Sequence, residues 1–268
     1  MMPADDLAAY FARIRHAGPA EPTLAVLRDL HARHPAAITF EGLDPFLGRP
    51  VPLDPAAVRA KLVRGRRGGY CHEHNALFHD VLAAVGFPVT ALGGRVLWMT
   101  PGRDAPLTHR LTLIDLPDGR FVADVGFGDQ TPTAPLSLEP GLEQVTPLGT
   151  YRVAQDGGVF ETQMRVGDRW EPMYRFTLAA RSPADFGMAN WFTSTHPHGR
   201  FVRNLVAARV VGETWVNLLN ASLSVRHPDG GVEHRTLTDA RSLGDVLMDT
   251  MGLDLPVPIE AIWKRLPS

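Results

Sequence analysis

The spacing of apolar residues changes near residue 87, and this change limits the possible folds more than any other feature of the chain. Up to residue 86, apolar side chains recur every three or four positions, as at Leu7, Tyr10 and Ile14, which predicts helices. From residue 89 onward, short apolar runs alternate with turn residues, which predicts strands. After residue 189 both patterns occur. We therefore expect an α+β fold in three parts, comprising residues 1–86, 87–189 and 190–268.

Caps and turns predict the individual elements. A helix is expected from Cys71 to Ala84, because a stripe of apolar residues at helical spacing runs up to Gly86, a residue type that commonly ends helices. Strands are expected at Val96–Met99, His109–Leu116 and Arg120–Phe127. The last two flank Pro117–Gly119, which is typical of a tight hairpin turn. The density of such turns favours a small barrel or sandwich over a parallel sheet.

Composition and charge exclude several functional classes. The 268 residues include 27 Lys and Arg against 29 Asp and Glu, so the basic excess that a nucleic-acid-binding protein needs is missing. No apolar run is long enough to cross a bilayer, and the first residues lack the features of a signal peptide. A single cysteine excludes an internal disulfide. A cytoplasmic protein without nucleic-acid or membrane partners is therefore expected.

That single cysteine, Cys71, stands where a nucleophile is expected. It follows Gly68 and Gly69, whose lack of a Cβ allows a backbone turn that other residues resist. It also begins the predicted helix, where free backbone amides and the positive end of the helix dipole stabilise a thiolate. Nearby arginines are expected to add positive charge in the same direction; they are Arg64, Arg66 and Arg67. The alternative is an inert buried thiol, because unpaired cysteine is among the most buried residue types.

A metal site is a second alternative for this segment. Four consecutive residues offer donor groups, namely Cys71, His72, Glu73 and His74. Neighbouring residues on a helix point in different directions, however, and ligands on one face are expected three or four positions apart. Only Cys71 and His74 meet that spacing well. The sequence therefore predicts that no metal ion is bound.

A thiolate nucleophile needs a base, and the base needs a group that orients it. Among eleven histidines, His109 opens a predicted strand, and Asp124 lies in the strand expected to pair with it across the hairpin. Apolar residues flank Asp124, so it is expected to be buried beside a specific partner. The alternative is that Asp124 only satisfies a turn or an arginine. Other histidines in helical or loop segments are expected to face solvent; they are His16, His31, His34, His79, His227 and His234.

The stretch from Arg67 to Asn75 resembles the signature of the arylamine N-acetyltransferase family, which reads Arg-Gly-Gly, any residue, Cys, any residue, Glu, any residue, Asn. Further similarities to the family keep their order along the chain, at Ile38–Asp44, Thr108-His109, Ala123–Gly128 and Trp191–Pro197. The resemblance implies an N-terminal helical bundle, a central β-barrel and a C-terminal α/β lid, with a core similar to that of papain-like proteases and transglutaminases. It also implies a catalytic triad of Cys71, His109 and Asp124.

The resemblance further implies a reaction in two steps. Cys71 would attack the thioester of acetyl-CoA and release CoA, which leaves an acetyl group on the sulfur. An aromatic amine or an aromatic hydrazine would then accept that group, with His109 moving protons and Asp124 orienting the imidazole. The implied co-substrate is thus acetyl-CoA, and the implied partners are small-molecule acceptors. The oligomeric state stays open.

Other positions match residues around the family's binding sites. Those expected to surround the acceptor, where aromatic rings suit a flat arylamine, are Phe40, Val96, Thr108, Phe127 and Phe201. Those expected near CoA are Trp98, Gly126 and Gly128. Core packing is the alternative for Phe40 and Val96. Glu73 is expected to point away from the sulfur and to pair with an arginine. Asp129 and His72 depart from the family pattern, and Asp129 adds a negative charge beside the loop expected near CoA.

Two rival enzyme functions use the same three residues. An amide synthase would close macrolactams with this chemistry, and a thiol hydrolase would pass the acyl group to water. A hydrolase would lose its acyl group quickly without any amine present. A non-enzymatic binding protein is disfavoured, because all three positions of the triad are filled.

Overall fold

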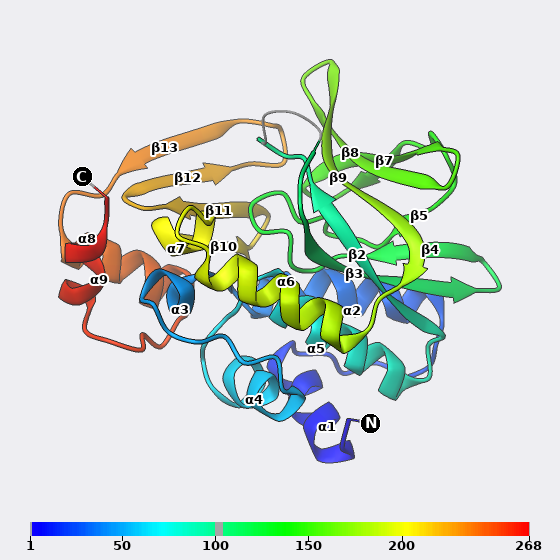
Figure 1. The fold of residues 1–268 in the computed structure, drawn as a ribbon, viewed down its shortest axis with the longest axis horizontal. Coiled ribbons are helices and arrows are strands. Elements are labelled where there is room, and N and C mark those ends of the chain that lie inside the picture. Colours follow the sequence, from blue (N-terminus) through cyan, green and yellow to red (C-terminus); the bar gives the residue numbers. More distant parts are fainter. Residues whose placement is uncertain (1, 100–103, 268) are drawn as a thin grey trace.

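The computed structural model describes residues 2–99 and 104–267, and its first part is mostly helical (Figure 1). Its elements are α1 (Ala4–Arg13), α2 (Leu24–Ala37), β1 (Phe40–Glu41), α3 (Leu43–Phe46), α4 (Pro55–Arg59), the π-helical turn η1 (Ala60–Arg64) and α5 (Cys71–Val85). Gly86 ends α5 with a φ of 102°, a left-handed conformation that favours glycine. The predicted helix beginning at Cys71 is confirmed, and it extends one residue beyond Ala84.

Helices α1, α2 and α5 pack around one apolar core. The hydroxyl of Thr23 accepts a hydrogen bond of 3.3 Å from the amide of Val26 and so caps the start of α2. Leu27 and Leu30 of α2 are fully buried and belong to the same cluster as Phe78 of α5. Each such side chain contributes about 1.5–3 kcal/mol on burial. This core fixes α5 against α2, and with it the direction of the helix that begins at the cysteine.

An eight-stranded antiparallel sheet forms the second part, in the order β5-β4-β3-β2-β9-β8-β7-β6. Its strands are β2 (Val89–Val96), β3 (Leu107–Leu116), β4 (Gly119–Ala123), β5 (Leu136–Ser137), β6 (Gln144–Thr146), β7 (Gly149–Asp156), β8 (Val159–Val166) and β9 (Arg169–Ala180). An isolated bridge between Pro140 and Val153 brings the end that carries β5 close to β7. The sheet is therefore nearly closed, which confirms the expectation of a barrel.

The predicted strand at Val96–Met99 is wrong. The strand β2 ends at Val96, because the next two backbone amides both donate to one carbonyl, that of Met173. Two consecutive amides that share an acceptor cannot continue a regular ladder. Met99 then adopts a φ of 54°, outside the strand region.

The predicted hairpin is confirmed, but its second strand is shorter than expected. Thr112 of β3 pairs with Ala123 of β4, where β4 ends. Beyond this residue, backbone amides bond to side chains instead of to a neighbouring strand, as the amide of Val125 does to Oδ1 of Asn75 at 3.0 Å. The segment that follows Ala123 is therefore shaped by its contacts with α5 rather than by the sheet.

A five-stranded sheet and further helices form the third part (Figure 1). The elements are α6 (Pro183–Thr195), α7 (Arg200–Arg203), β10 (Val206–Val211), β11 (Thr214–Leu219), β12 (Ser222–Arg226), β13 (Val232–Thr236), α8 (Ala240–Gly244), the π-helical turn η2 (Asp245–Thr250) and α9 (Ile259–Arg265). The sheet order is β1-β10-β11-β12-β13, so β1 of the N-terminal region completes it at one edge. Across the described residues, no helix is both long and apolar enough to cross a membrane.

A chain of hydrogen bonds between neutral side chains lies inside the helical part. Oη of Tyr10 lies 2.8 Å from Nδ1 of His34, and Nε2 of His34 lies 2.9 Å from Nδ1 of His74. Nε2 of His74 lies 3.1 Å from the carbonyl oxygen of Thr39. Because a carbonyl only accepts, His74 must carry its proton on Nε2, which requires the same of His34 and makes Tyr10 a donor.

The structure contradicts the expectation that His31 and His34 of α2 and His16 face solvent. His31 and His34 are fully buried, because α1 and α5 cover α2, and His16 is buried as well. Burial lowers the pKa of His31 and of His74 to about 4, and it lowers the pKa of His34 well below its ordinary value. All three imidazoles are therefore neutral in the folded protein near pH 7.

Acidification should destabilise the fold through these histidines. The unfolded chain binds protons below a pKa of about 6.5, whereas buried His74 stays neutral until about pH 4, so stability is lost as pH falls through that window. For His74 alone, the loss between about pH 7.5 and about pH 5.5 is on the order of 1 kcal/mol. Urea unfolding at the two pH values should show a smaller loss in His74→Gln than in the parent protein.

His234→Gln is the matched control, because that histidine is exposed. It should lose as much stability on acidification as the parent does. An equal pH dependence for His74→Gln and the parent would contradict the neutral chain.

Candidate active site

The turn before Cys71 brings two backbone segments into close contact. The amide of Gly69 donates to the carbonyl oxygen of Thr39 at 3.4 Å. A Cβ on Gly68 would lie 1.8 Å from that same oxygen, and a Cβ on Gly69 would lie 2.7 Å from a carboxylate oxygen of Glu73. Neither glycine has a positive φ. They are needed for close approach, therefore, and not for the unusual backbone turn that the sequence suggested.

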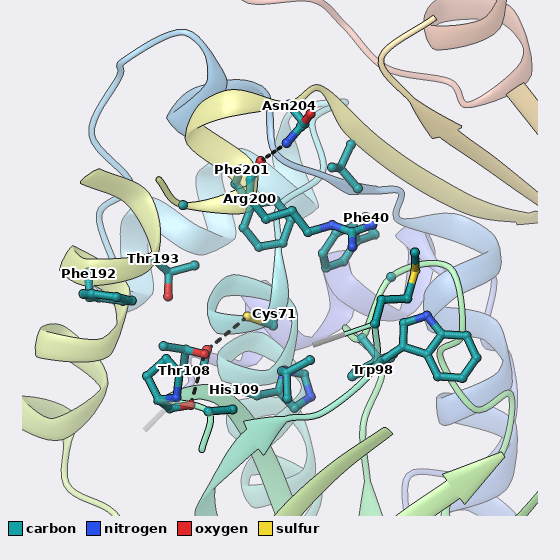
Figure 2. Close-up of a pocket in the computed structure, with 18 of the residues that line it drawn as sticks. Phe40, Cys71, Trp98, Thr108, His109, Phe192, Thr193, Arg200, Phe201 and Asn204 are labelled. Atoms are coloured by element: carbon teal, nitrogen blue, oxygen red, sulfur yellow. Dashed lines mark hydrogen bonds between the residues drawn. The ribbon is translucent and has the colours of Figure 1, made fainter. Parts of the chain in front are cut away.

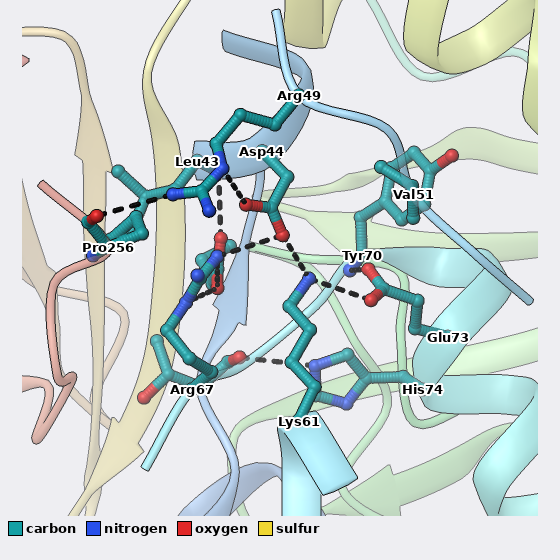
Figure 3. A network of polar contacts seen from close by, with 12 residues as sticks. Leu43, Asp44, Arg49, Val51, Lys61, Arg67, Tyr70, Glu73, His74 and Pro256 are labelled. Atoms are coloured by element: carbon teal, nitrogen blue, oxygen red, sulfur yellow. Dashed lines mark hydrogen bonds and ion pairs between the residues drawn. The ribbon is translucent and has the colours of Figure 1, made fainter. Parts of the chain in front are cut away.

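Buried ion pairs hold this turn in place (Figure 3). Nζ of Lys61 lies 2.7 Å from carboxylate oxygens of both Asp44 and Glu73. The guanidinium of Arg67 lies 2.8 Å from Glu41 and 3.0 Å from Asp44. Removing one partner from a buried network costs about 3–5 kcal/mol, because a charge is left uncompensated. The network joins α3, η1 and the first turn of α5, and so fixes where that helix begins.

The same network corrects two expectations. Glu73 pairs with Lys61 and not with an arginine. The charge of Arg67 is taken up by its carboxylate partners, and Arg64 forms an ion pair with Asp6. These two arginines are therefore already paired. Support for a thiolate comes instead from the helix start and from the group described next.

Cys71, His109 and Asp124 lie together where α5 meets the barrel. Nε2 of His109 lies 2.7 Å from Oδ2 of Asp124, and both side chains are almost fully buried. The sulfur of Cys71 lies 3.7 Å from the carbonyl oxygen of Thr108, the residue before the histidine (Figure 2). Because Asp124 occupies Nε2, the nitrogen left for the sulfur is Nδ1.

Charge in this group favours a protonated imidazole. Burial alone would lower the pKa of His109, but the charge and hydrogen bond of Asp124, together with those of Cys71, raise it to about 10. Burial alone would raise the pKa of Asp124, but His109, Asn75 and the amide of Gly126 outweigh burial and lower it. At neutral pH, His109 is thus an imidazolium between a carboxylate and the sulfur. Such a cation stabilises a thiolate.

The side chain of Asn75 holds Asp124 in place. Its Nδ2 donates to Oδ1 of Asp124 at 2.8 Å and to the carbonyl oxygen of Arg110 at 2.7 Å. Oδ1 of Asp124 also accepts from the amide of Gly126 at 3.0 Å. The amide of Asp124 itself donates to Nε2 of His31 at 3.3 Å, a contact that the sequence gave no reason to expect. The carboxylate is therefore fixed on both of its oxygens.

A cavity of about 540 Å³ opens in front of the sulfur. Its wall contains Cys71 and His109, together with these residues predicted near acceptor or CoA: Phe40, Val96, Trp98, Thr108, Phe127, Gly128 and Phe201 (Figure 2). Of the described residues predicted near CoA, only Gly126 does not line the cavity. A Cβ there would lie 2.8 Å from Cβ of His74, so Gly126 allows close packing against α5 instead.

Sequence reasoning missed part of the wall. The segment from α6 to α7 contributes Phe192, Thr193, His198, Arg200 and Asn204. Nδ2 of Asn204 donates to the carbonyl oxygen of Arg200 at 3.0 Å, which ties the two ends of α7 together. The available signal was proximity in the chain to Phe201, which Arg200 adjoins and from which His198 and Asn204 are three positions away. Asp129 also lines the cavity, beside Gly128.

The chemistry available here is nucleophilic. Within the described residues, no group of three or more His, Cys, Asp or Glu side chains is placed to hold a metal ion. A sulfur at a helix start, an imidazolium beside it and a fixed carboxylate are instead the groups that form and break a thioester.

Known proteins of similar sequence and structure carry the same fold. Residues 23–259 match a family model described as N-acetyltransferase. The arylamine N-acetyltransferase of Mycobacterium tuberculosis strain H37Rv is 44% identical over an alignment of 257 positions, which covers 93% of this chain and 90% of that protein. The solved structure of Mycobacterium marinum arylamine N-acetyltransferase in complex with CoA has a TM-score of 0.92 and 41% identity, and covers 97% of this chain and 100% of that one. The arylamine N-acetyltransferase of Salmonella typhimurium also has a TM-score of 0.92, with 37% identity and 99% of both chains covered. Similarity of this extent along nearly the whole chain confirms the resemblance, and the protein belongs to the arylamine N-acetyltransferase family.

Proposed function

We propose that this enzyme transfers an acetyl group from acetyl-CoA to an aromatic amine through a thioester on Cys71. One observation carries the proposal above all. The imidazole of His109, bound to Asp124 at 2.7 Å, shares one cavity wall with the sulfur of Cys71. An imidazolium beside the sulfur supports acyl transfer through a thioester, and the relatives favour an arylamine as the acceptor.

In the first step, the thiolate of Cys71 attacks the carbonyl carbon of the acetyl thioester. A carbon–sulfur bond to Cys71 forms and the carbon–sulfur bond to CoA breaks. The imidazolium of His109 gives its proton to the departing CoA sulfur, and Asp124 keeps the ring oriented. The backbone amide of Cys71, free at the helix start, donates to the oxyanion of the tetrahedral intermediate.

In the second step, the nitrogen of the acceptor attacks the acetyl carbon. His109 is neutral at this point and takes the proton that the nitrogen loses, while the thiolate of Cys71 departs and is restored. Aromatic hydrazines are included among the proposed acceptors, because their terminal nitrogen is nucleophilic without deprotonation. The enzyme then returns to the imidazolium and thiolate with which it began.

The cavity wall supports a flat apolar acceptor. Phe40, Phe127 and Phe201 line the cavity in front of the sulfur, where aromatic rings favour stacked or edge contacts with an aryl group. Figure 2 labels the first and the last of them. Trp98 and Gly128 line the same cavity and are proposed to contact CoA. Donor and acceptor then use one space in turn, which suits a reaction that stores the acetyl group on the protein between steps.

Each of the three proposed parts has its own role in this reaction. Residues 1–86 carry the nucleophile, residues 87–189 carry the histidine and the aspartate, and residues 190–268 supply a wall of the cavity. A cytoplasmic location stays a prediction, supported by the need for a reduced thiol. Macrolactam closure and hydrolysis use the same triad, but the relatives favour transfer to an arylamine.

Brief exposure to acetyl-CoA should add one acetyl mass to the intact protein. Cys71→Ala should gain none, because the only sulfur nucleophile is missing. An aromatic amine, or an aromatic hydrazine in a parallel sample, should remove the adduct and appear as its acetylated product. Intact-protein mass spectrometry measures the adduct, and chromatography measures the product.

The lifetime of the adduct without an amine separates the alternatives. Loss to water as fast as loss to an amine would favour a hydrolase. The protein could instead gain no acetyl group while Cys71 still reacts quickly with iodoacetamide. That result would reject acetyl-CoA as the donor but not Cys71 as the nucleophile.

Asp124→Asn should slow acetylation of Cys71 by roughly 10²–10⁴-fold. The new amide would donate to Nε2 of His109, which forces the proton onto Nδ1 and removes the imidazolium that stabilises the thiolate. Rapid-mixing measurement of single-turnover acetylation tests this, with circular dichroism as a check on folding. Asp115→Asn is the control, because Asp115 is an exposed acid paired with Arg120 on the same hairpin. A rate within a few fold of the parent for Asp124→Asn would reject the assigned role.

A further inference from the structure

A second cavity, of about 430 Å³, lies on the other side of the catalytic strand. Successive side chains of a strand point to opposite faces, so β3 presents His109 to the first cavity and Arg110 to the second. The wall of the second cavity comes from α4, α5, β2, β3 and the start of α6. None of the residues that line it takes part in the reaction described above.

Two guanidinium groups face this cavity without a bonding partner. Among the described residues, neither Arg110 nor Arg181 has a side-chain hydrogen bond or an ion pair, and Nε of each is buried. Cζ of Arg110 lies 4.4 Å from the centre of the Phe186 ring, a contact that satisfies no N–H group. A buried donor without an acceptor is costly, by about 1–3 kcal/mol. An acceptor placed in the cavity would remove that cost.

The remaining charges leave this space positive. Arg59 also lines it but already pairs with Asp6 at 2.7 Å. Burial lowers the pKa of His79 to about 4, so this histidine is neutral at pH 7. Asp80 is the one carboxylate in the wall; it attracts Arg110 electrostatically but lies in no ion pair of 4.0 Å or less with the described residues. Two guanidinium groups without a hydrogen-bond acceptor among the described residues therefore face a single carboxylate.

The rest of the wall is apolar and selects the kind of anion. Leu53, Val58, Leu77, Ala91 and Phe186 surround the polar groups. An inorganic anion would leave this apolar surface in contact with water, whereas an organic anion with a hydrocarbon body would cover it. A planar carboxylate also matches the two-pronged geometry of a guanidinium.

We propose that the second cavity binds a small organic carboxylate, with its charged group at Arg110 and Arg181 and its hydrocarbon body against the apolar wall. The proposal is independent of the acetyl-transfer reaction, because it uses none of the triad residues. It assigns a function to two arginines that the reaction leaves without one.

Calorimetric titration with sodium hexanoate tests the site. The parent protein should bind one hexanoate, and carbamidomethylation of Cys71 should leave the affinity unchanged. Hexan-1-ol, which has the same chain but no charge, should show no saturable binding. Arg110→Gln and Arg181→Gln should each weaken hexanoate binding about tenfold or more, since a hydrogen bond to a charged group contributes about 1.5–3 kcal/mol. Asp80→Asn should tighten it, because the repelling carboxylate is removed.

Two controls keep the result decisive. Arg165→Gln removes an exposed arginine of the barrel and should not change hexanoate binding. Arg200→Gln removes a cation from the first cavity and should not change it either. Melting temperatures establish that the variants fold. In case Arg110→Gln does not fold, the hexanoate affinity of Arg181→Gln decides the test.

Three results would overturn the proposal. One is the absence of saturable binding up to about 50 mM hexanoate, well above the millimolar range of weak specific sites. Another is unchanged affinity in Arg181→Gln and in any folded Arg110→Gln. The third is loss of binding in Arg200→Gln or after carbamidomethylation, which would place hexanoate in the first cavity.

Discussion

The side-chain amide of Asn75 is the contact on which the geometry of the active site depends. The proposed nucleophile, Cys71, begins a helix, while His109 belongs to the barrel and Asp124 follows its strand β4. Nothing in the local chain therefore fixes their relative positions. Asn75, one turn along α5 from Cys71, donates to Asp124 and to the backbone of β3 and accepts from the amide of Val125. An amide that serves all three groups at once requires the helix and the barrel to meet in a single arrangement.

Two kinds of polar contact, ion pairs and hydrogen bonds between neutral groups, hold α5 against the rest of the helical part. On one side, Lys61 lies 2.7 Å from Glu73 in a network of acidic and basic side chains. On the other, His74 belongs to a chain of neutral donors and acceptors that ends at the carbonyl oxygen of Thr39. That carbonyl also receives the amide of Gly69, so a single backbone oxygen contacts both the turn before the helix and the helix itself. Several independent contacts therefore fix the position of the first turn of α5, as the precise placement of a nucleophile requires.

Local rules predicted the elements whose signals are local. The helix from Cys71 follows from its apolar stripe and from Gly86, and the hairpin that brings Asp124 toward His109 follows from Pro117–Gly119 and strand register. The family resemblance then supplied the three residues proposed as the triad and part of the cavity wall.

What the sequence could not supply depends on contacts between distant segments. Burial of His31 and His34 depends on how α1 and α5 cover α2, and no property of the α2 sequence specifies that cover. The pairing of Glu73 with Lys61 requires that η1 pass the first turn of α5, which spacing along the chain does not reveal. Gly68 and Gly69 were correctly singled out, but for backbone freedom and not for the close approach that they provide.

The wall of the first cavity and the groups proposed to react come in part from different segments of the chain, and this bears on how such enzymes diversify. The groups proposed to react lie on α5, β3 and the segment after β4. Phe192 and Arg200 lie on α6 and α7, and Asn204 directly follows α7. Substitutions at these three positions can therefore reshape the space offered to a substrate while the hydrogen bonds of His109 and Asp124 stay in place. Variation there changes which molecules are accepted while the bond-making step is inherited intact. A lineage can explore new substrates by altering one short stretch of chain.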